Sequence, residues 1–155
     1  MEISVFAHAT EDEERVRRAV MNLIPEGVDA VGAEVQRLRG HHNDPILLMT
    51  MRIKRRRAAG ELFRNLIRGL SPPDRLRLLD EVEDRVDEAG SLYLRLDKQE
   101  AYRGRAALHD VDPIRMKFRF RVPHKADPVT FVRSPVSNII DEIENGPGDR
   151  DFAGG

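Results

Sequence analysis

Apolar and polar residues alternate without interruption along the segment that runs from residue 114 to residue 122. Alternate positions hold an apolar set and a cationic set: Ile114, Met116, Phe118, Phe120 and Val122 against Arg115, Lys117, Arg119 and Arg121. Successive side chains of a β-strand point to opposite faces, so the pattern predicts a strand with one buried face and one face carrying four cations. No acid lies between Ile114 and Lys125 to neutralise them. We therefore expect this face to attract a polyanion.

The rest of the chain divides into segments with the strand period of two and segments with the helix period near 3.6. Strands are predicted over residues 2–9, 28–38, 46–54, 91–97 and 114–122, and residues 105–109 are left open as a further short strand. Helices are predicted after the first strand, after the third strand up to residue 70, and from residue 72 to about residue 89, with a helical turn over residues 97–102. Consecutive strands with short connections favour an α+β fold with a mostly antiparallel sheet, helices packed on one face and the order βαββααββ.

Two local motifs predict where helices begin. Thr10 and Glu13 form the T-x-x-E capping-box pattern, in which each side chain accepts a hydrogen bond from a free N–H of the first turn. Ser71 is a good capping residue, and the prolines that follow it fit the first helical turn. We therefore expect one helix to begin at Thr10 and another directly after Ser71.

The length of 155 residues indicates one domain with a single core, followed by a segment of different composition. We expect residues 1–125 to form the α+β domain and residues 126–155 to form a Pro/Gly-rich acidic tail. The first part holds 24 Lys and Arg against 21 Asp and Glu, whereas the tail holds 2 against 6. Within the tail we expect a helix over residues 136–144 and disorder over the last ten or so residues.

Composition excludes several classes of protein. No apolar run approaches the twenty residues of a membrane span, and the beginning of the chain lacks a signal-peptide pattern. The absence of cysteine excludes disulfides and thiolate metal sites, and fits a cytoplasmic protein. A Gly-rich phosphate loop and a dinucleotide fingerprint are also missing, so no cofactor is expected.

Catalytic and metal-binding residues are poorly indicated. His41, His42, Asn43 and Asp44 follow one another in a turn, but no further histidine lies at the spacing of a metal site, so no metal is expected. Asp44, Asp97 and Glu100, near Lys98, leave a metal-dependent nuclease open as an alternative, although their spacing does not distinguish them from ordinary loop acids. No nucleophile-elbow motif is present. The sequence therefore favours a non-enzymatic protein.

Three polar segments rich in cations carry the strongest functional signal. Residues 52–57 hold five cations where a strand passes into a helix, residues 97–103 hold Tyr102, and residues 115–121 form the alternating strand. If helices cover one face of the sheet, Arg95 shares the open face with this strand, and Arg52 and Lys54 lie at its margin. Such a plate of cations is typical of proteins that contact a nucleic-acid backbone. The candidate RNA-binding residues are Arg52, Lys54, Arg55, Arg56, Arg57, Arg95, Lys98, Gln99, Tyr102, Arg115, Lys117, Arg119 and Arg121.

Several motifs, spread over residues 2–122, resemble one family. They are HATEDEERV from His8, RGHHNDPILLM from Arg39, the basic run RIKRRR, and LYLRLDKQEAYRG from Leu92. In this order they are similar to the archaeal RNA-binding family once labelled a domain of unknown function, whose members are often called predicted exosome subunits. The resemblance implies a fold similar to the ribosomal protein that binds 5S rRNA. His42 departs from the family pattern, in which an aromatic residue is usual at that position, and so does the acidic tail.

The residues and the resemblance together indicate a non-catalytic protein that binds structured or ribosomal RNA through a basic sheet face, with the exosome or the ribosome as candidate assemblies. One alternative is an interaction subunit whose basic face docks an acidic protein partner, and another is the nuclease described above. The sequence leaves the choice between a monomer and a homodimer open.

Overall fold

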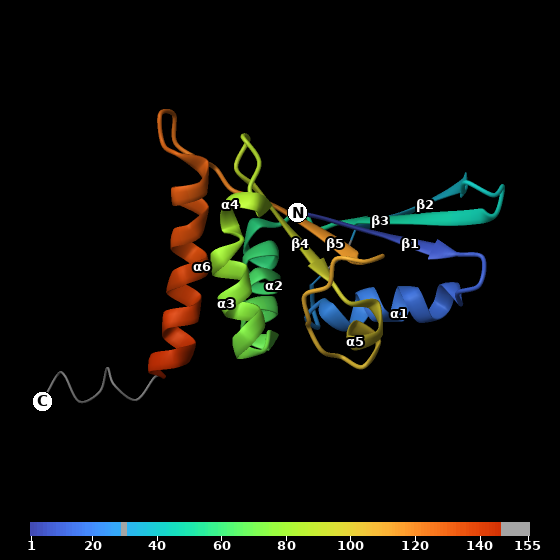
Figure 1. Ribbon diagram of the computed structural model, residues 1–155, viewed down its shortest axis with the longest axis horizontal. Coiled ribbons are helices and arrows are strands. Elements are labelled where there is room, and N and C mark those ends of the chain that lie inside the picture. The colour runs from blue at the N-terminus through green and yellow to red at the C-terminus, as the bar shows by residue number, and fades with distance from the viewer. Residues whose placement is uncertain (29–30, 147–155) are drawn as a thin grey trace, which may run out of the picture.

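The computed structural model describes residues 1–28 and 31–146, which form five strands and six helices (Figure 1). The strands are β1 Glu2–His8, β2 Val31–Arg39, β3 Pro45–Arg52, β4 Ser91–Leu96 and β5 Ile114–Arg119. The helices are α1 Glu13–Leu23, α2 Arg56–Gly69, α3 Pro72–Asp80, α4 Val82–Arg85, α5 Lys98–Tyr102 and α6 Pro128–Asn145. No helix of this described part is both long enough and apolar enough to cross a membrane.

The strands form one sheet in the order β2-β3-β1-β5-β4, and every neighbouring pair is antiparallel. The first strand of the chain therefore lies in the centre, with β3 on one side and β5 on the other. This arrangement confirms the α+β class and the antiparallel sheet predicted from the sequence.

The helices lie on one side of the sheet and at one end of it, and leave the other face open. In Figure 1 the sheet is seen nearly edge-on with α1 and α5 beneath it, while α2, α3, α4 and α6 gather at the end away from the β2–β3 turn. The face toward the helices carries buried apolar residues from β1 and its neighbour β5: Ile3, Val5, Ala7, Ile114, Met116 and Phe118. The alternation in β1 and β5 thus gives the sheet one buried face and one solvent-exposed face.

The basic strand is shorter than predicted, because it ends at Arg119 rather than at Val122. Its partner β4 begins only at Ser91, after a turn in which Gly90 has a positive φ of 84°. Beyond the last ladder pair, Phe120 N–H donates to Gly90 O at 3.1 Å, and its ring packs edge-on against Phe63 of α2, with centroids 5.5 Å apart. Arg121 therefore lies on the loop that leaves the sheet.

The first helix starts at Glu13 with Asp12 as its N-cap, so the capping box predicted at Thr10 is wrong. The side chain of Asp12 accepts from Glu14 N–H at 2.9 Å. Residues 8–11 instead form a turn, because Glu11 N–H donates to His8 O at 2.9 Å and the Glu11 carboxylate accepts from His8 N–H. Because of this turn the helix is capped two residues later than predicted, at Asp12 instead of Thr10.

The segment between β3 and β4 holds three helices rather than two. Ser71 caps α3 as predicted and accepts from Asp74 N–H at 3.3 Å. That helix ends at Asp80, and Glu81 separates it from the four-residue α4. Residues 105–109 do not form the predicted strand, because only an isolated bridge joins Leu108 to Leu96.

The final helix is twice as long as predicted. It begins at Pro128 with Asp127 as its cap, and its buried residues Val132, Val136, Ile139 and Ile140 join the same core as the strands. The predicted start at residue 136 is wrong, because Pro135 lies inside α6 although proline disfavours a helix interior. The disorder predicted for the end of the chain falls on residues 147–155, outside the described residues.

Candidate nucleic-acid interface

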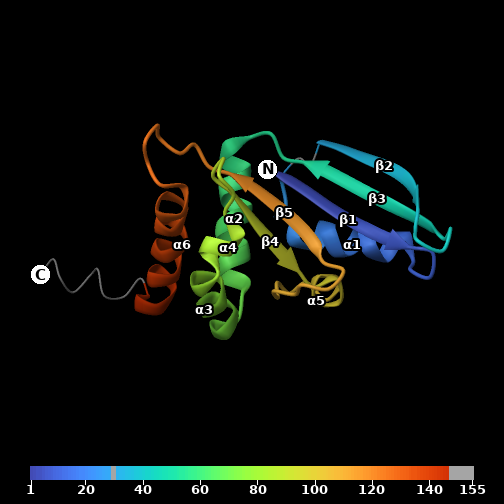
Figure 2. The ribbon, with the colours of Figure 1, turned by 45° about the horizontal axis from the view of Figure 1, so that its top comes forward.

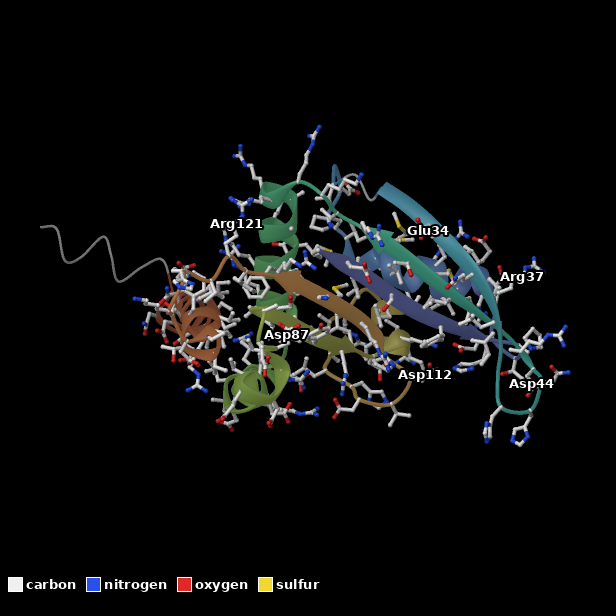
Figure 3. All side chains as sticks on the ribbon, turned by 90° about the horizontal axis from the view of Figure 1, so that it is seen from above. Glu34, Arg37, Asp44, Asp87, Asp112 and Arg121 are labelled. Atoms are coloured by element: carbon white, nitrogen blue, oxygen red, sulfur yellow. The ribbon has the colours of Figure 1, made fainter. Side chains whose placement is uncertain are left out.

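The open face of the sheet brings together side chains from four strands, which Figure 3 shows from above. Directly opposed residues of an antiparallel pair point to the same face, so the register defines rows across the sheet. One row contains Arg52, Glu2, Lys117 and Tyr93, and the next contains Thr50, Ser4, Arg115 and Arg95. Arg119 follows opposite Ser91. Cations from β3, β4 and β5 therefore share one surface, which we call the open-face cluster: Arg52, Arg95, Arg115, Lys117 and Arg119.

Four members of the open-face cluster have no anionic partner among the described residues. Arg95, Arg115 and Arg119 are exposed, and none of them forms an ion pair within residues 1–28 and 31–146. Lys117 is half-buried, with its ammonium nitrogen 5.5 Å from the centroid of the Tyr93 ring. A cation above an aromatic face is stabilised without being neutralised, so the charge of Lys117 stays available to an anion.

Arg52 differs from the other members of the cluster because it pairs with an acid, Glu2 of the neighbouring strand β1. Its Nε donates to Glu2 Oε2 at 3.3 Å, and both side chains are exposed. Exposed ion pairs of this kind contribute little to stability and are weakened by salt. The positive charge of the face is therefore concentrated toward β5 and β4.

The amino group of Met1 lies near Arg119, the last residue of β5. It donates to Ile53 O at 3.0 Å. Burial disfavours its charged form and repulsion from Arg119 adds to this, so the pKa of the Met1 amino group is lowered from its ordinary value.

The basic run predicted at residues 52–57 lies at the junction of β3 and α2. Lys54, Arg55, Arg56 and Arg57 are all exposed, whereas Ile53 between them and Arg52 is buried. Arg55 is the N-cap of α2 but makes no capping hydrogen bond, and the first turn contains no acid. Positive side chains at a helix N-terminus oppose the helix dipole. Folding of the isolated chain therefore does not explain why this junction is basic.

Tyr93 is held in place by a carboxylate in the turn before β4. Asp87 accepts from Ala89 N–H at 3.0 Å and Ser91 N–H at 2.9 Å, and its second oxygen accepts from the Tyr93 hydroxyl at 3.0 Å. These donors, with Ser91 N–H contributing most, lower the pKa of the Asp87 carboxyl against the opposing effect of burial. The ring of Tyr93 is thereby fixed under Lys117 (Asp87 is labelled in Figure 3).

The three residues predicted in the 97–103 segment do not lie on the open face. Lys98 is largely buried, with its Nζ donating to Phe6 O at 2.6 Å and pairing with Glu11 at 3.1 Å and Asp112 at 2.8 Å. Gln99 and Tyr102, together with Lys98, line a cleft of about 580 Å³ between α1 and α5, where the Arg15 guanidinium lies 5.7 Å from the centre of the Tyr102 ring.

Around Lys98 the fold brings together three side chains of the kinds that bind metal ions, which sequence spacing did not reveal. His8, Glu11 and Asp112 place one ligand atom each within 4.8 Å of one another. His8 Nε2 lies 3.0 Å from Asp112 Oδ1. Burial raises the pKa of the Asp112 carboxyl, but hydrogen bonds from Lys98 and His8 outweigh it, and the pKa is lowered. The ammonium of Lys98 already supplies a positive charge to both carboxylates, so this group is satisfied without a metal ion.

The three acids weighed for a nuclease lie in two different parts of the fold. Asp44 lies at the tip of the β2–β3 turn, next to the exposed His41 and His42 (Figure 3). Asp97 caps α5 by accepting from Glu100 N–H at 2.9 Å, and Glu100 pairs with Arg105 at 3.0 Å. The Asp97 side chain therefore serves a helix cap and the Glu100 side chain a local ion pair, whereas Asp44 contributes its backbone carbonyl to the turn, by accepting from Gly40 N–H at 2.8 Å.

A second cleft, of about 270 Å³, adjoins the open face where β4 meets α3 and α4. Its lining consists of Arg77, Glu81, Asp84, Arg85, Tyr93, Arg95 and Asp110. Five of these residues lie outside every segment that the sequence singled out. No local pattern indicates them, because α3, α4 and the loop before β5 meet only in the folded chain.

Comparison with known proteins identifies the family of this chain. A family model described as RNA binding matches residues 1–120. The chain belongs to this RNA-binding family. The RNA-binding protein PAB1135 of Pyrococcus abyssi is 38% identical over 122 residues, which are 76% of this chain and 79% of that protein.

Two solved structures of DUF54 proteins share the fold. The protein from Archaeoglobus fulgidus has a TM-score of 0.73 and 28% identity, and the alignment covers 89% of this chain and 96% of that one. The protein from Methanothermobacter thermautotrophicus has a TM-score of 0.66 and 33% identity, with 89% and 94% covered. These matches confirm the resemblance drawn from the motifs. The match to the RNA-binding family contains the whole sheet but ends before α6.

Proposed function

We propose that this protein binds the phosphate backbone of RNA on the open face of its sheet. The observation that carries the proposal is a group of four cations, Arg95, Arg115, Lys117 and Arg119, that have no ion-pair partner within residues 1–28 and 31–146 and lie on a face that no described helix covers (Figure 3). The chain's membership of an RNA-binding family supports RNA as the polyanion. Arg is well suited to this task, because its guanidinium matches phosphate geometry.

The positions of the cations suit a chain of phosphates. Arg115 and Arg95 are direct cross-strand neighbours, so their Cβ atoms lie about 5 Å apart, and residues two apart along β5 are separated by about 7 Å. Like charges at these distances repel each other in the free protein, and a polyanion along the face relieves the repulsion.

The margin of the interface is formed by the basic junction before α2. We infer that Lys54, Arg55, Arg56 and Arg57 extend the footprint, together with Arg52 and with Arg121 on the loop after β5. A phosphate near the uncapped start of α2 would reverse the unfavourable interaction between these cations and the helix dipole. Lys98, Gln99 and Tyr102 lie outside this footprint.

The chemistry of the face favours RNA with a defined shape over an extended single strand. Tyr93 and Phe6 are its aromatic side chains on β4 and β1, and both are half-buried, so successive stacked bases find no platform. We infer that the target is a structured RNA, with ribosomal RNA in the cytoplasm as the leading candidate. The sequence motifs support association with the exosome or the ribosome.

The salt dependence of RNA binding tests the proposal. We expect the affinity for a structured RNA to fall steeply as salt rises, because each neutralised phosphate contributes about 0.7–0.9 to the log–log slope. Replacing Arg115, Lys117 and Arg119 together by serine removes three contacts and should lower that slope by about two to three units. Filter binding or fluorescence anisotropy over a series of KCl concentrations measures both effects.

A matched control carries the same loss of charge on other surfaces. Arg18 of α1, Arg68 of α2 and Arg133 of α6 are exposed and lie off the open face. Replacing these three by serine should leave the slope within about half a unit of the wild type. Equal slopes for the two triple variants would contradict the proposal, because they would show that net charge, rather than the open face, determines binding.

A further inference from the structure

The cleft between β4, α3 and α4 continues the open face but differs from it in charge. Its walls contain three arginines and three acids: Arg77, Arg85 and Arg95 with Glu81, Asp84 and Asp110. Carboxylates that surround a small volume repel a phosphate. The cleft therefore suits an uncharged polar group, next to a surface that suits phosphates.

The walls of this cleft are fixed by ion pairs. Arg77 Nε donates to Glu81 at 2.9 Å, and its Nη2 binds Asp110. The buried Arg85 donates from Nε and Nη2 to the other oxygen of Glu81, at 3.0 and 2.6 Å. The Arg77 hydrogen bond contributes most to lowering the pKa of both the Glu81 and the Asp110 carboxyl, so both acids stay ionised. The network holds the cleft open without using all of its polar groups.

Two charged side chains of the lining remain unengaged. In the part of the chain that the structure describes, neither the Asp84 carboxylate nor the Arg95 guanidinium makes a hydrogen bond or an ion pair. One supplies only acceptors and the other only donors. Together with the ring of Tyr93 they present the groups that proteins use to recognise a flipped base, namely a stacking surface and partners for its edges.

The position of the cleft relates it to the backbone-binding residues. Arg95 lies opposite Arg115, and Tyr93 lies opposite Lys117. A nucleotide whose phosphate contacts β5 would therefore have its base beside β4, at the mouth of the cleft. Of the four bases, guanine combines two adjacent donors, which a carboxylate accepts, with the O6 and N7 acceptors, which a guanidinium binds in bidentate fashion.

We propose that this cleft binds one unpaired guanine of the RNA whose backbone lies on the open face, with Asp84 and Arg95 contacting its edges. The inference rests on the proposed function and adds a base-specific subsite to it: Arg95 binds the base, and Arg115, Lys117 and Arg119 remain the contacts to the backbone. Paired guanines are excluded, because their edge donors are already bonded within the helix. The protein then selects structured RNAs that display an extrahelical guanine.

Binding to a set of RNA hairpins tests this inference. The set comprises one hairpin with a single bulged guanine, the same hairpin with a bulged uridine, and the fully paired parent. We expect the full-length protein to bind the guanine bulge about tenfold more tightly than the other two, a ratio within the range measured for single base contacts. Equal affinity for all three hairpins would overturn the inference.

Replacement of Asp84 by asparagine separates the cleft from the open face. Asp84 is exposed, and within the described residues its side chain has no partner whose loss would unfold α4. Asp84→Asn should abolish the guanine preference while general affinity stays the same or rises, because one negative charge is removed. Glu83→Gln removes the same charge from the neighbouring exposed position, outside the cleft, and should keep the tenfold preference.

The two proposals fail in different ways in this experiment. Salt-dependent binding of every hairpin with no guanine preference, or a preference that Asp84→Asn retains, would refute the subsite and leave backbone binding intact. Absence of binding to all three hairpins at low salt would refute the proposed function itself.

Discussion

Lys98 shows how one side chain joins segments that are distant in the sequence. Its ammonium bonds the β1 carbonyl of Phe6, the Glu11 carboxylate before α1 and the Asp112 carboxylate before β5. Asp112 itself has a positive φ of 46°, a conformation that aspartate tolerates better than most residues. A lysine in a polar motif of an RNA-binding family is therefore occupied inside the protein.

Replacing Lys98 by methionine should lower the free energy of unfolding by roughly 2 kcal/mol. The change keeps the length of the buried stem but leaves two carboxylates without their cation, and their partial exposure moderates the loss. Urea unfolding followed by circular dichroism measures the change. Lys125→Met at an exposed loop position is the control and should stay within about 0.5 kcal/mol. A wild-type unfolding curve together with weakened RNA binding would assign Lys98 to the RNA interface instead.

Among the elements, α2 combines a good apolar stripe with a poor N-terminus. Leu62, Phe63, Leu66 and Ile67 are buried, so packing holds the helix in place whatever its first turn contains.

The sequence revealed this stripe, the Ser71 cap and the alternation of β5, because each depends on neighbours within one or two turns. It did not reveal the end of β5 or the start of α6, because the first depends on where β4 begins and the second on a core that α6 helps to complete.

Arg56→Glu should stabilise the protein while it weakens RNA binding. The residue occupies the first position of α2, where an acid interacts favourably with the helix dipole, so reversing the charge should raise the unfolding free energy by about 1 kcal/mol. The same reversal should reduce affinity at low salt and lower the salt slope. Arg64→Glu, at an exposed position further along α2, serves as the control for charge alone. A gain in stability with unchanged affinity would remove the α2 junction from the interface.

At the scale of the molecule, one end carries the open sheet and the other carries the helices. Figure 2 shows α6 beside α2 and α3 at the end opposite the β2–β3 turn. The predicted sheet, its open face and its cations could be derived from periodicity. The strand order, the α3–α4 cleft and the neighbours of Lys98 could not, because they depend on contacts between residues 30 to more than 100 positions apart.

The contribution of α6 to the fold can be measured without disturbing the open face. Val136 is fully buried, and its replacement by alanine should lower the unfolding free energy by about 2 kcal/mol through lost burial and the cavity left behind. Asn138→Ala, exposed on the same helix, should change it by less than about 0.5 kcal/mol. RNA affinity should be unchanged in both variants. If Val136→Ala also left the unfolding free energy unchanged, α6 would be an appendage rather than part of the core.

The central position of the first strand has a consequence for synthesis. As the nascent chain leaves the ribosome, β1 can pair with β3 once residue 52 has emerged, but its other edge stays unpaired until β5 arrives. β5 is also the strand that connects β4 to the rest of the sheet. The sheet can therefore be completed only after about three quarters of the chain has been synthesised. Until then the unpaired edge of β1 can pair with a strand of another chain.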